Sequence, residues 1–185
     1  MSSAQYGSAP PPFQYRVNKY ERRKGSFGSL VDRGANGGIL GSDARVIYTH
    51  MRTVNVTGID NHQLDELKIV DGSATATTQF GDVIIILRQY ALFGRDRTIH
   101  SCAQLEYYKN TVNDRSMQVG GFQHISTQDG YLFPLDIVNG MVYLRMRPNT
   151  DDEWDNLPHV VLTHGSSWDP RVIDNILSAK EDWVN

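Results

Sequence analysis

The sequence GSLVDRGANGGILG, residues 28–41, places an aspartate between two apolar residues and a run of glycines. Leu30 and Val31 have the character of a buried strand, and Asp32 follows them directly. Gly34 can adopt a positive φ angle, and small residues let another backbone approach closely. This pattern indicates a strand that ends in a carboxylate, held on a tight loop at the floor of a cleft. The alternative is that Asp32 is an ordinary turn residue, because Asp and Gly dominate turns.

The length and composition of the chain fit one globular domain with some additional segments. Of its 185 residues, 39% are apolar, which is enough to build a core. The 18 basic and 21 acidic residues give a net charge of −3, so binding to nucleic acid is not expected. The single cysteine, Cys102, excludes an internal disulfide and a cysteine-rich zinc site, and it fits a reducing compartment.

The sequence predicts no membrane segment. The longest apolar run, Val83–Leu87, is too short to cross a bilayer, and the first residues lack the apolar core of a secretory signal. We therefore expect an intracellular, cytoplasmic protein without a membrane partner.

The first 25 residues are expected to form a disordered lead-in to the folded part. Residues 1–12 are mostly Ser, Ala, Gly and Pro, which cannot bury enough apolar surface to order themselves. Residues 13–25 are rich in Lys and Arg, which is typical of a solvated linker; contact with nucleic acid is the alternative.

From residue 29 onward the pattern predicts β-strands. After the Asp32 loop, the next strand is expected at 45–48. Residues 52–59 alternate between apolar and polar, and a return strand is expected from residue 67. Gly58 lies near the turn between them, so this hairpin is suited to act as a mobile flap. Residues 82–87 form a branched apolar run that is typical of a buried strand.

Helix signals come late in the chain. Ser101 and Gln104 have the spacing of a capping box, which predicts a helix that ends before Asn113. Asn139-Gly140 predicts a two-residue hairpin turn. The remaining expected strands lie at 118–122, 130–137 and 141–146, and a short helix is expected at 170–179.

Taken in order, these motifs resemble the retropepsins, the aspartic proteases of retroviruses and retrotransposons. The shared pattern is apolar-apolar-Asp-x-Gly-Ala at 30–35, a flap near Gly58, and apolar-apolar-Gly-Arg-Asp at 92–96 before a helix. Residues 99–105 and 129–143 are similar to the stretch that follows the protease in copia-type retrotransposon polyproteins, where a Ser-x-x-Gln-Leu helix precedes an Asn-Gly hairpin.

The resemblance implies a mainly all-β fold, a retropepsin-like acid-protease barrel with a flap hairpin, plus C-terminal β-hairpins and short helices. It places the retropepsin-like domain at 26–110, a β-hairpin extension at 111–150 and an acidic, tryptophan-containing tail at 151–185. Whether the chain beyond residue 110 packs on the preceding part is open. The loop after Asp32 is expected to be crossed by the strand that carries Leu92-Phe93.

The resemblance also implies an aspartic endopeptidase that cleaves extended segments of its polyprotein, without cofactor or metal, in the cytoplasm or in a retrotransposon particle. Because the chain has one Asp-x-Gly-Ala loop, a homodimer would supply two Asp32 carboxylates that activate one water. Like charges in close contact share one proton, so one carboxylate acts as acid and the other as base. The residues that shape the loop or cover the peptide would be Gly34, Ala35, Gly58, Ile59 and Asp60.

Arg33 departs from the family, which has Ser or Thr at this position. A hydroxyl there bonds to the neighbouring loop and fixes the pair of carboxylates, whereas arginine has no acceptor and its charge opposes a shared proton. The second hypothesis is therefore a degenerate, non-catalytic protease-like module that only binds. Arg33 would leave the pair undisturbed if it pointed outward and paired with Asp43 or Glu21.

A third hypothesis is a metal-dependent nuclease. Glu66 and Lys68, with Asp60 or alternatively Asp43 before them, follow the Asp…Glu-x-Lys spacing in which two carboxylates hold Mg²⁺ and the lysine steadies the attacking water, although such spacing often arises by chance. The six histidines lack the close spacing and the partner ligands of a zinc site, so they are expected to be structural or on the surface.

Overall fold

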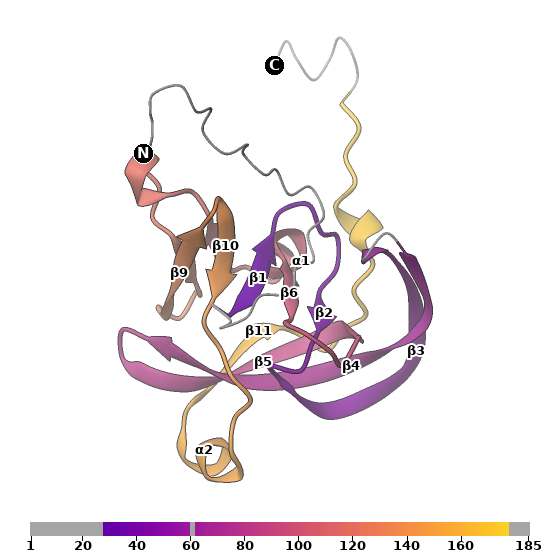
Figure 1. The fold of residues 1–185 in the computed structure, drawn as a ribbon, viewed down its shortest axis with the longest axis horizontal. Helices are drawn as coiled ribbons and strands as arrows, with labels where there is room; N and C mark the ends of the chain where they lie inside the picture. The colour runs from indigo at the N-terminus through magenta and orange to yellow at the C-terminus, as the bar shows by residue number, and fades with distance from the viewer. Residues whose placement is uncertain (1–27, 60–61, 178–185) are drawn as a thin grey trace, which may run out of the picture.

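The computed structural model describes residues 28–59 and 62–177, and the fold of these residues is mainly β (Figure 1). The helical segments are α1 (Cys102–Tyr107), α2 (Asp151–Asn156) and the 3₁₀ turns η1 (Met117–Val119) and η2 (Pro170–Ile173). The strands are β1 (Ser29–Asp32), β2 (Ile39–Leu40), β3 (Arg45–Ile59), β4 (His62–Thr78), β5 (Gly81–Leu92), β6 (Ile99–Ser101), β7 (Thr111–Asn113), β8 (His124–Ser126), β9 (Leu132–Val138), β10 (Met141–Leu144) and β11 (His159–Thr163).

The strands form one curled sheet in the order β3-β4-β5-β2-β6-β1-β10-β9-β8-β7, and β11 pairs with β5. The long strands β3, β4 and β5 bend beneath the shorter strands, so that the sheet has the form of a half-barrel (Figure 1). The expectation of a mainly all-β fold is therefore confirmed.

The strand that carries Asp32 lies between two segments from later in the chain. β1 runs parallel to β6, with Asp32 opposite Ser101, and antiparallel to β10, with Leu30 opposite Tyr143. The strand that carries Leu92, expected to cross the loop after Asp32, pairs with the far end of that loop, where Leu92 lies opposite Leu40 and Ala91 N donates to Gly38 O. Leu92 ends β5, and the neighbour of Asp32 itself is the short strand β6, whose apolar residue Ile99 packs beside Leu30.

The predicted flap is a long hairpin of β3 and β4. The strand expected at 45–48 and the one expected at 52–59 are one strand of 15 residues, and β4 has 17 residues. Several register shifts interrupt their pairing, which lets a long two-stranded ribbon bend. Gly58 has a φ of 96° near the turn. Asp60 lies outside the described residues.

The chain beyond residue 110 belongs to the same sheet as the part before it. β10 completes the pairing of β1, and β11 runs parallel to β5 with Val160 opposite Ile85. The strand at 159–163 was not anticipated, because a five-residue run in an acidic segment gives a weak signal. The expectation of a strand at 118–122 is wrong: Gln118 and Val119 belong to η1, the Gly120 that caps it has a φ of 87°, and residues 121–122 are loop.

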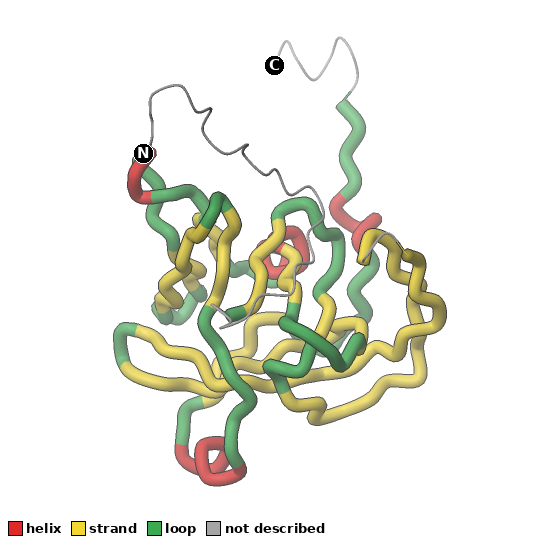
Figure 2. Tube along the Cα trace, in the orientation of Figure 1, coloured by secondary structure: helices red, strands yellow, loops and turns green. Residues whose placement is uncertain are grey.

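The helical segments are short: α1, η1 and α2 lie between strands along the chain, and η2 follows β11 (Figure 2). Ser101 caps α1 as predicted, since its side chain accepts a hydrogen bond from Gln104 N. The complete capping box is the one in α2, between Thr150 and Glu153. The helix expected at 170–179 is only the turn η2, and the last two of those residues lie outside the described part. Within the described ranges, every helix falls short of the length and apolar character that crossing a bilayer requires.

The main core lies between β5 and the segments that cover it. It contains Leu40, Leu87, Leu105, Phe133 and Leu162, all fully buried. A smaller cluster joins Leu30, Ile39, Ile99 and Tyr143, and the flap residues Val56 and Leu64 pack against it. The β3–β4 hairpin is thus in apolar contact with the strands around Asp32.

Substitutions in β11 test whether this strand is part of the core. Leu162 is 0% exposed and Val161 is 37% exposed in the same strand. Leu162→Ala should lower the free energy of unfolding by about 2–5 kcal/mol, because it leaves a cavity. Val161→Ala should lower the free energy of unfolding by less than about 1 kcal/mol. Urea unfolding measures both, and equal losses would contradict the placement of β11.

Candidate functional site

The Asp32 carboxylate lies at the end of β1 and is held by its own loop. Its Oδ1 accepts a hydrogen bond from Gly34 N at 2.8 Å, and Ala35 N donates to the Asp32 carbonyl at 3.3 Å. The residue is 7% exposed. Oδ2 is buried and accepts no hydrogen bond from any described residue. A buried carboxylate oxygen without a partner is costly, and such groups are a feature of functional sites.

Three side chains from distant parts of the chain fix the loop after Asp32. Ser101 Oγ donates to the Ala35 carbonyl at 2.8 Å, and Gly38 N donates to Gln104 Oε1 at 2.8 Å. Trp168 Nε1 donates to the Asn36 carbonyl at 2.8 Å. The loop is therefore fixed at its start, middle and end.

A buried Tyr–His pair lies beneath the same loop. A Cβ atom at Gly38 would come within 2.6 Å of the Tyr90 ring, so only glycine fits there. The Tyr90 hydroxyl lies 2.7 Å from His100 Nδ1 in a hydrogen bond, and both residues are fully buried. Burial lowers the pKa of His100 to about 3, so the imidazole is neutral. Burial also raises the pKa of Tyr90.

Arg33 points to helix α1 and the strand after it. Its Nη1 donates to Glu106 Oε1 at 2.7 Å, and its Nε and Nη2 donate to the Asp114 carboxylate at 3.3 Å each. These hydrogen bonds, first with Glu106 and then with Asp114, raise the pKa of Arg33. The expected pairing with Asp43 is wrong, because the Asp43 carboxylate accepts from Thr98 N and Oγ1 and from Ser29 Oγ. Glu21, the other expected partner, lies outside the described residues.

Asp32 opens onto a cleft of about 1070 Å³. The cleft is lined by the loop from Gly34 to Ile39, by β3 between Arg52 and Gly58, and by the segment Ser167–Arg171. Of the predicted site residues, Asp32, Gly34, Ala35 and Gly58 lie around this one space. Arg33 turns away from it, and Ile59 pairs with His62 at the end of the flap. The arrangement can hold an extended chain between the Asp32 loop and the flap.

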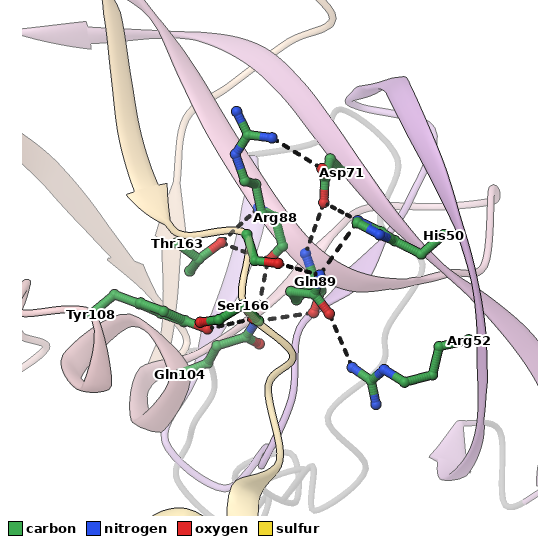
Figure 3. Close-up of polar contacts among 10 residues, drawn as sticks. His50, Arg52, Asp71, Arg88, Gln89, Gln104, Tyr108, Thr163 and Ser166 are labelled. Atoms are coloured by element: carbon green, nitrogen blue, oxygen red, sulfur yellow. Dashed lines mark hydrogen bonds and ion pairs between the residues drawn. The ribbon is translucent and has the colours of Figure 1, made fainter.

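A polar network supports the wall of the cleft (Figure 3). Asp71 is 2% exposed. Its carboxylate is hydrogen-bonded to His50 Nε2 at 2.7 Å and accepts from Arg88 Nη1 at 3.1 Å and from Gln89 N at 3.2 Å. Gln89 is buried with a φ of 65°, which is rare for a residue with a side chain. Such strain persists only where the surroundings enforce it, and it clusters at functional sites.

Sequence reasoning missed the residues that support the cleft. Gln104 was expected to close a capping box, but its side chain instead bonds Gly38 and the carbonyls of Arg88 and Gln89. The sequence pattern places Trp168 in an acidic tail, whereas its side chain is 5% exposed and lies against the loop. A signal for Trp168 would have been the rarity of a solvated tryptophan in a tail.

The described residues give no support to a metal site. Glu66 and Lys68 are both exposed on β4. No cluster of three or more His, Cys, Asp or Glu residues suited to a metal ion occurs in the ranges 28–59 and 62–177. Asp60, the third residue of the nuclease pattern, is outside them.

Comparison of the chain with models of protein families, with curated proteins and with solved structures found no match.

The buried His100 makes stability depend on pH. Its pKa is about 3 in the folded protein and about 6.5 when unfolded, so the unfolded chain binds the extra proton. The contribution of His100 is complete above pH 6.5 and falls by about 1.4 kcal/mol per pH unit between pH 6.5 and 3. His100→Gln, whose oxygen can still accept from Tyr90, should flatten this decline. Urea unfolding at several pH values measures it, and parallel profiles for both proteins would contradict the assignment.

Proposed function

We propose that this chain is the aspartic endopeptidase-like domain of a copia-type retrotransposon polyprotein and that it cleaves extended peptide segments. The observation that carries the proposal is the Asp32 carboxylate. It is fixed by Gly34 N, its Oδ2 accepts no hydrogen bond from a described residue, and it lines the same cleft as Gly58 near the end of the β3–β4 hairpin. This combination favours acid–base chemistry on a bound chain over an ordinary turn.

The proposed reaction needs a second carboxylate, which a second copy of the chain supplies. The sequence contains one Asp-x-Gly-Ala loop, so the two Asp32 residues of a homodimer form the pair. Close carboxylates share one proton, and the pair therefore holds one acid and one base. The base takes a proton from water as the water attacks the peptide carbonyl, and the acid protonates the carbonyl oxygen. The carboxylate that took the proton then gives it to the amide nitrogen while the other carboxylate takes a proton from the diol, and the C–N bond breaks to release an amine and a carboxylic acid.

The flap and the loop have separate roles in this proposal. The hairpin of β3 and β4 covers the bound peptide, excludes water and offers backbone groups for strand addition. Gly34 supplies the N–H that orients the carboxylate, and Ala35 leaves room beside it. The Arg33 guanidinium forms ion pairs with Glu106 and Asp114. Its positive charge is therefore compensated on the side of the loop that faces away from the proposed carboxylate pair. This pairing reduces the support for a module that only binds.

Asp32→Asn tests the proposed chemistry. The amide oxygen can still accept from Gly34 N, so the fold should persist with an unchanged melting temperature. Peptide cleavage at acidic pH should fall by about 10²–10⁴-fold or more, because the general acid–base group is lost. Asp129→Asn is the matched control, since Asp129 lies in an exposed turn. Wild-type cleavage should be blocked by pepstatin and rise faster than linearly with protein concentration; cleavage by Asp32→Asn at the wild-type rate would refute the proposal.

Arg33→Ser tests whether the arginine disables the site. Because the guanidinium is bound to Glu106 and Asp114, restoring the hydroxyl of the family should not raise the cleavage rate. Loss of these half-exposed ion pairs should lower the free energy of unfolding by about 1 kcal/mol or less. Peptide assays and thermal unfolding of the Ser variant measure both effects. A sharp rise in activity would show instead that Arg33 suppresses catalysis, as the hypothesis of a degenerate module assumes.

A further inference from the structure

The C-terminal segment Gly165–Arg171, called the strap below, forms one wall of the cleft. Side chains from three other elements hold its carbonyl groups. Gln89 Nε2 donates to Gly165 O at 3.1 Å, Tyr108 Oη to Ser166 O at 3.1 Å, and Arg52 Nη2 to Trp168 O at 3.3 Å. Figure 3 shows the side chains of Gln89 and Tyr108 reaching the start of the strap. Together with the bond from Trp168 to the Asp32 loop, these contacts make the strap a preformed wall.

Four charged residues line the cleft: Asp32, Arg52, Asp169 and Arg171. Two of them neutralise each other, because Arg171 Nη2 lies 2.7 Å from Asp169 Oδ2 and Arg171 Nε donates to the same carboxylate. The hydrogen bonds from Arg171 lower the pKa of Asp169 to about 2, and the charge of Arg52 adds a smaller contribution. Arg52 therefore remains as the cation of the lining that no described carboxylate binds directly.

The Arg52 guanidinium is oriented by hydrogen bonds at one of its three nitrogens. Its Nη2 donates to Gln89 Oε1 at 3.1 Å as well as to Trp168 O, while Nε and Nη1 form no hydrogen bond with a described residue. Gln89 is itself fixed by its backbone bond to Asp71 and its side-chain bond to the strap. A guanidinium held at one nitrogen presents its other N–H groups as a fork that matches a carboxylate.

We propose that Arg52 is a specificity-determining residue of the cleft, which binds the carboxylate of a Glu or Asp side chain in the bound peptide. This rests on the proposed function, because the cleft must take an extended peptide. The occupant is thus a chain with an apolar centre near Asp32 and one acidic side chain that reaches the wall between β3 and the strap.

The experiment measures peptide binding separately from cleavage. The full-length Asp32→Asn protein is titrated into fluorescein-labelled eight-residue peptides with a central Leu-Phe pair, and one flanking position at a time carries Glu or Gln. Fluorescence anisotropy gives the Kd of each pair. At one position Glu should bind about ten- to a hundredfold more tightly than Gln, the range expected for one charge-assisted contact.

Variants of Arg52 assign that preference to this side chain. In the Asp32→Asn background, Arg52→Gln should abolish the preference for Glu, Arg52→Lys should retain part of it, and Arg52→Glu should transfer it to a Lys peptide. Arg115→Gln is the matched control, because Arg115 is an exposed arginine that does not line the cleft. Loss of the preference in Arg115→Gln would assign it to overall charge and overturn the proposal.

The outcomes separate this proposal from the proposed function. Equal binding of Glu and Gln peptides at every position overturns the role of Arg52, even if the wild-type protein cleaves them. A preference for Glu that depends on Arg52 supports the role. If the wild-type protein then cleaves none of these peptides, the endopeptidase proposal fails while the assignment of Arg52 stands.

Discussion

The parallel pairing of β1 with β6 is the constraint on which the rest of the structure depends. Parallel neighbours cannot be joined by a tight turn, so the chain must leave β1 and return to it by a long connection. The Asp32 loop, the flap hairpin and β5 make up that connection. On return, Ser101 lies opposite Asp32, and its hydroxyl both caps α1 and donates to Ala35 O. One short pairing thus sets the position of the carboxylate, the loop and the helix.

A second support reaches the loop through a single buried amide. Gln104 is 1% exposed, and it accepts from Gly38 N while donating to the carbonyls of Arg88 and Gln89. The left-handed conformation of Gln89 costs on the order of 1–3 kcal/mol, which the surrounding bonds must offset. Asp71 contributes to this by accepting from Gln89 N. The strain at Gln89 is therefore tied to the same contacts that shape the cleft.

The predictable parts of the fold are those that local residues determine. The Asp32 loop, the hairpin around Gly58 and the Asn139-Gly140 turn can all be predicted from short stretches; Asn139 and Gly140 both have positive φ angles, as this kind of turn requires. The contacts that could not be predicted join residues far apart in sequence. Arg33 pairs with residues 73 and 81 positions away, and Trp168 bonds a carbonyl 132 positions away. Neither periodicity nor turn chemistry carries information about such partners.

The same distances explain why the cleft depends on the whole described chain. Both neighbours of β1 come from later segments, since β6 begins at Ile99 and β10 at Met141. A chain ending at residue 110 would lack β10 and would leave one edge of the Asp32 strand with unpaired backbone groups, which is unfavourable for a buried strand. It would also lack Trp168, whose indole fixes Asn36, and the strap that forms one wall. The C-terminal segments therefore complete the site that begins at Asp32.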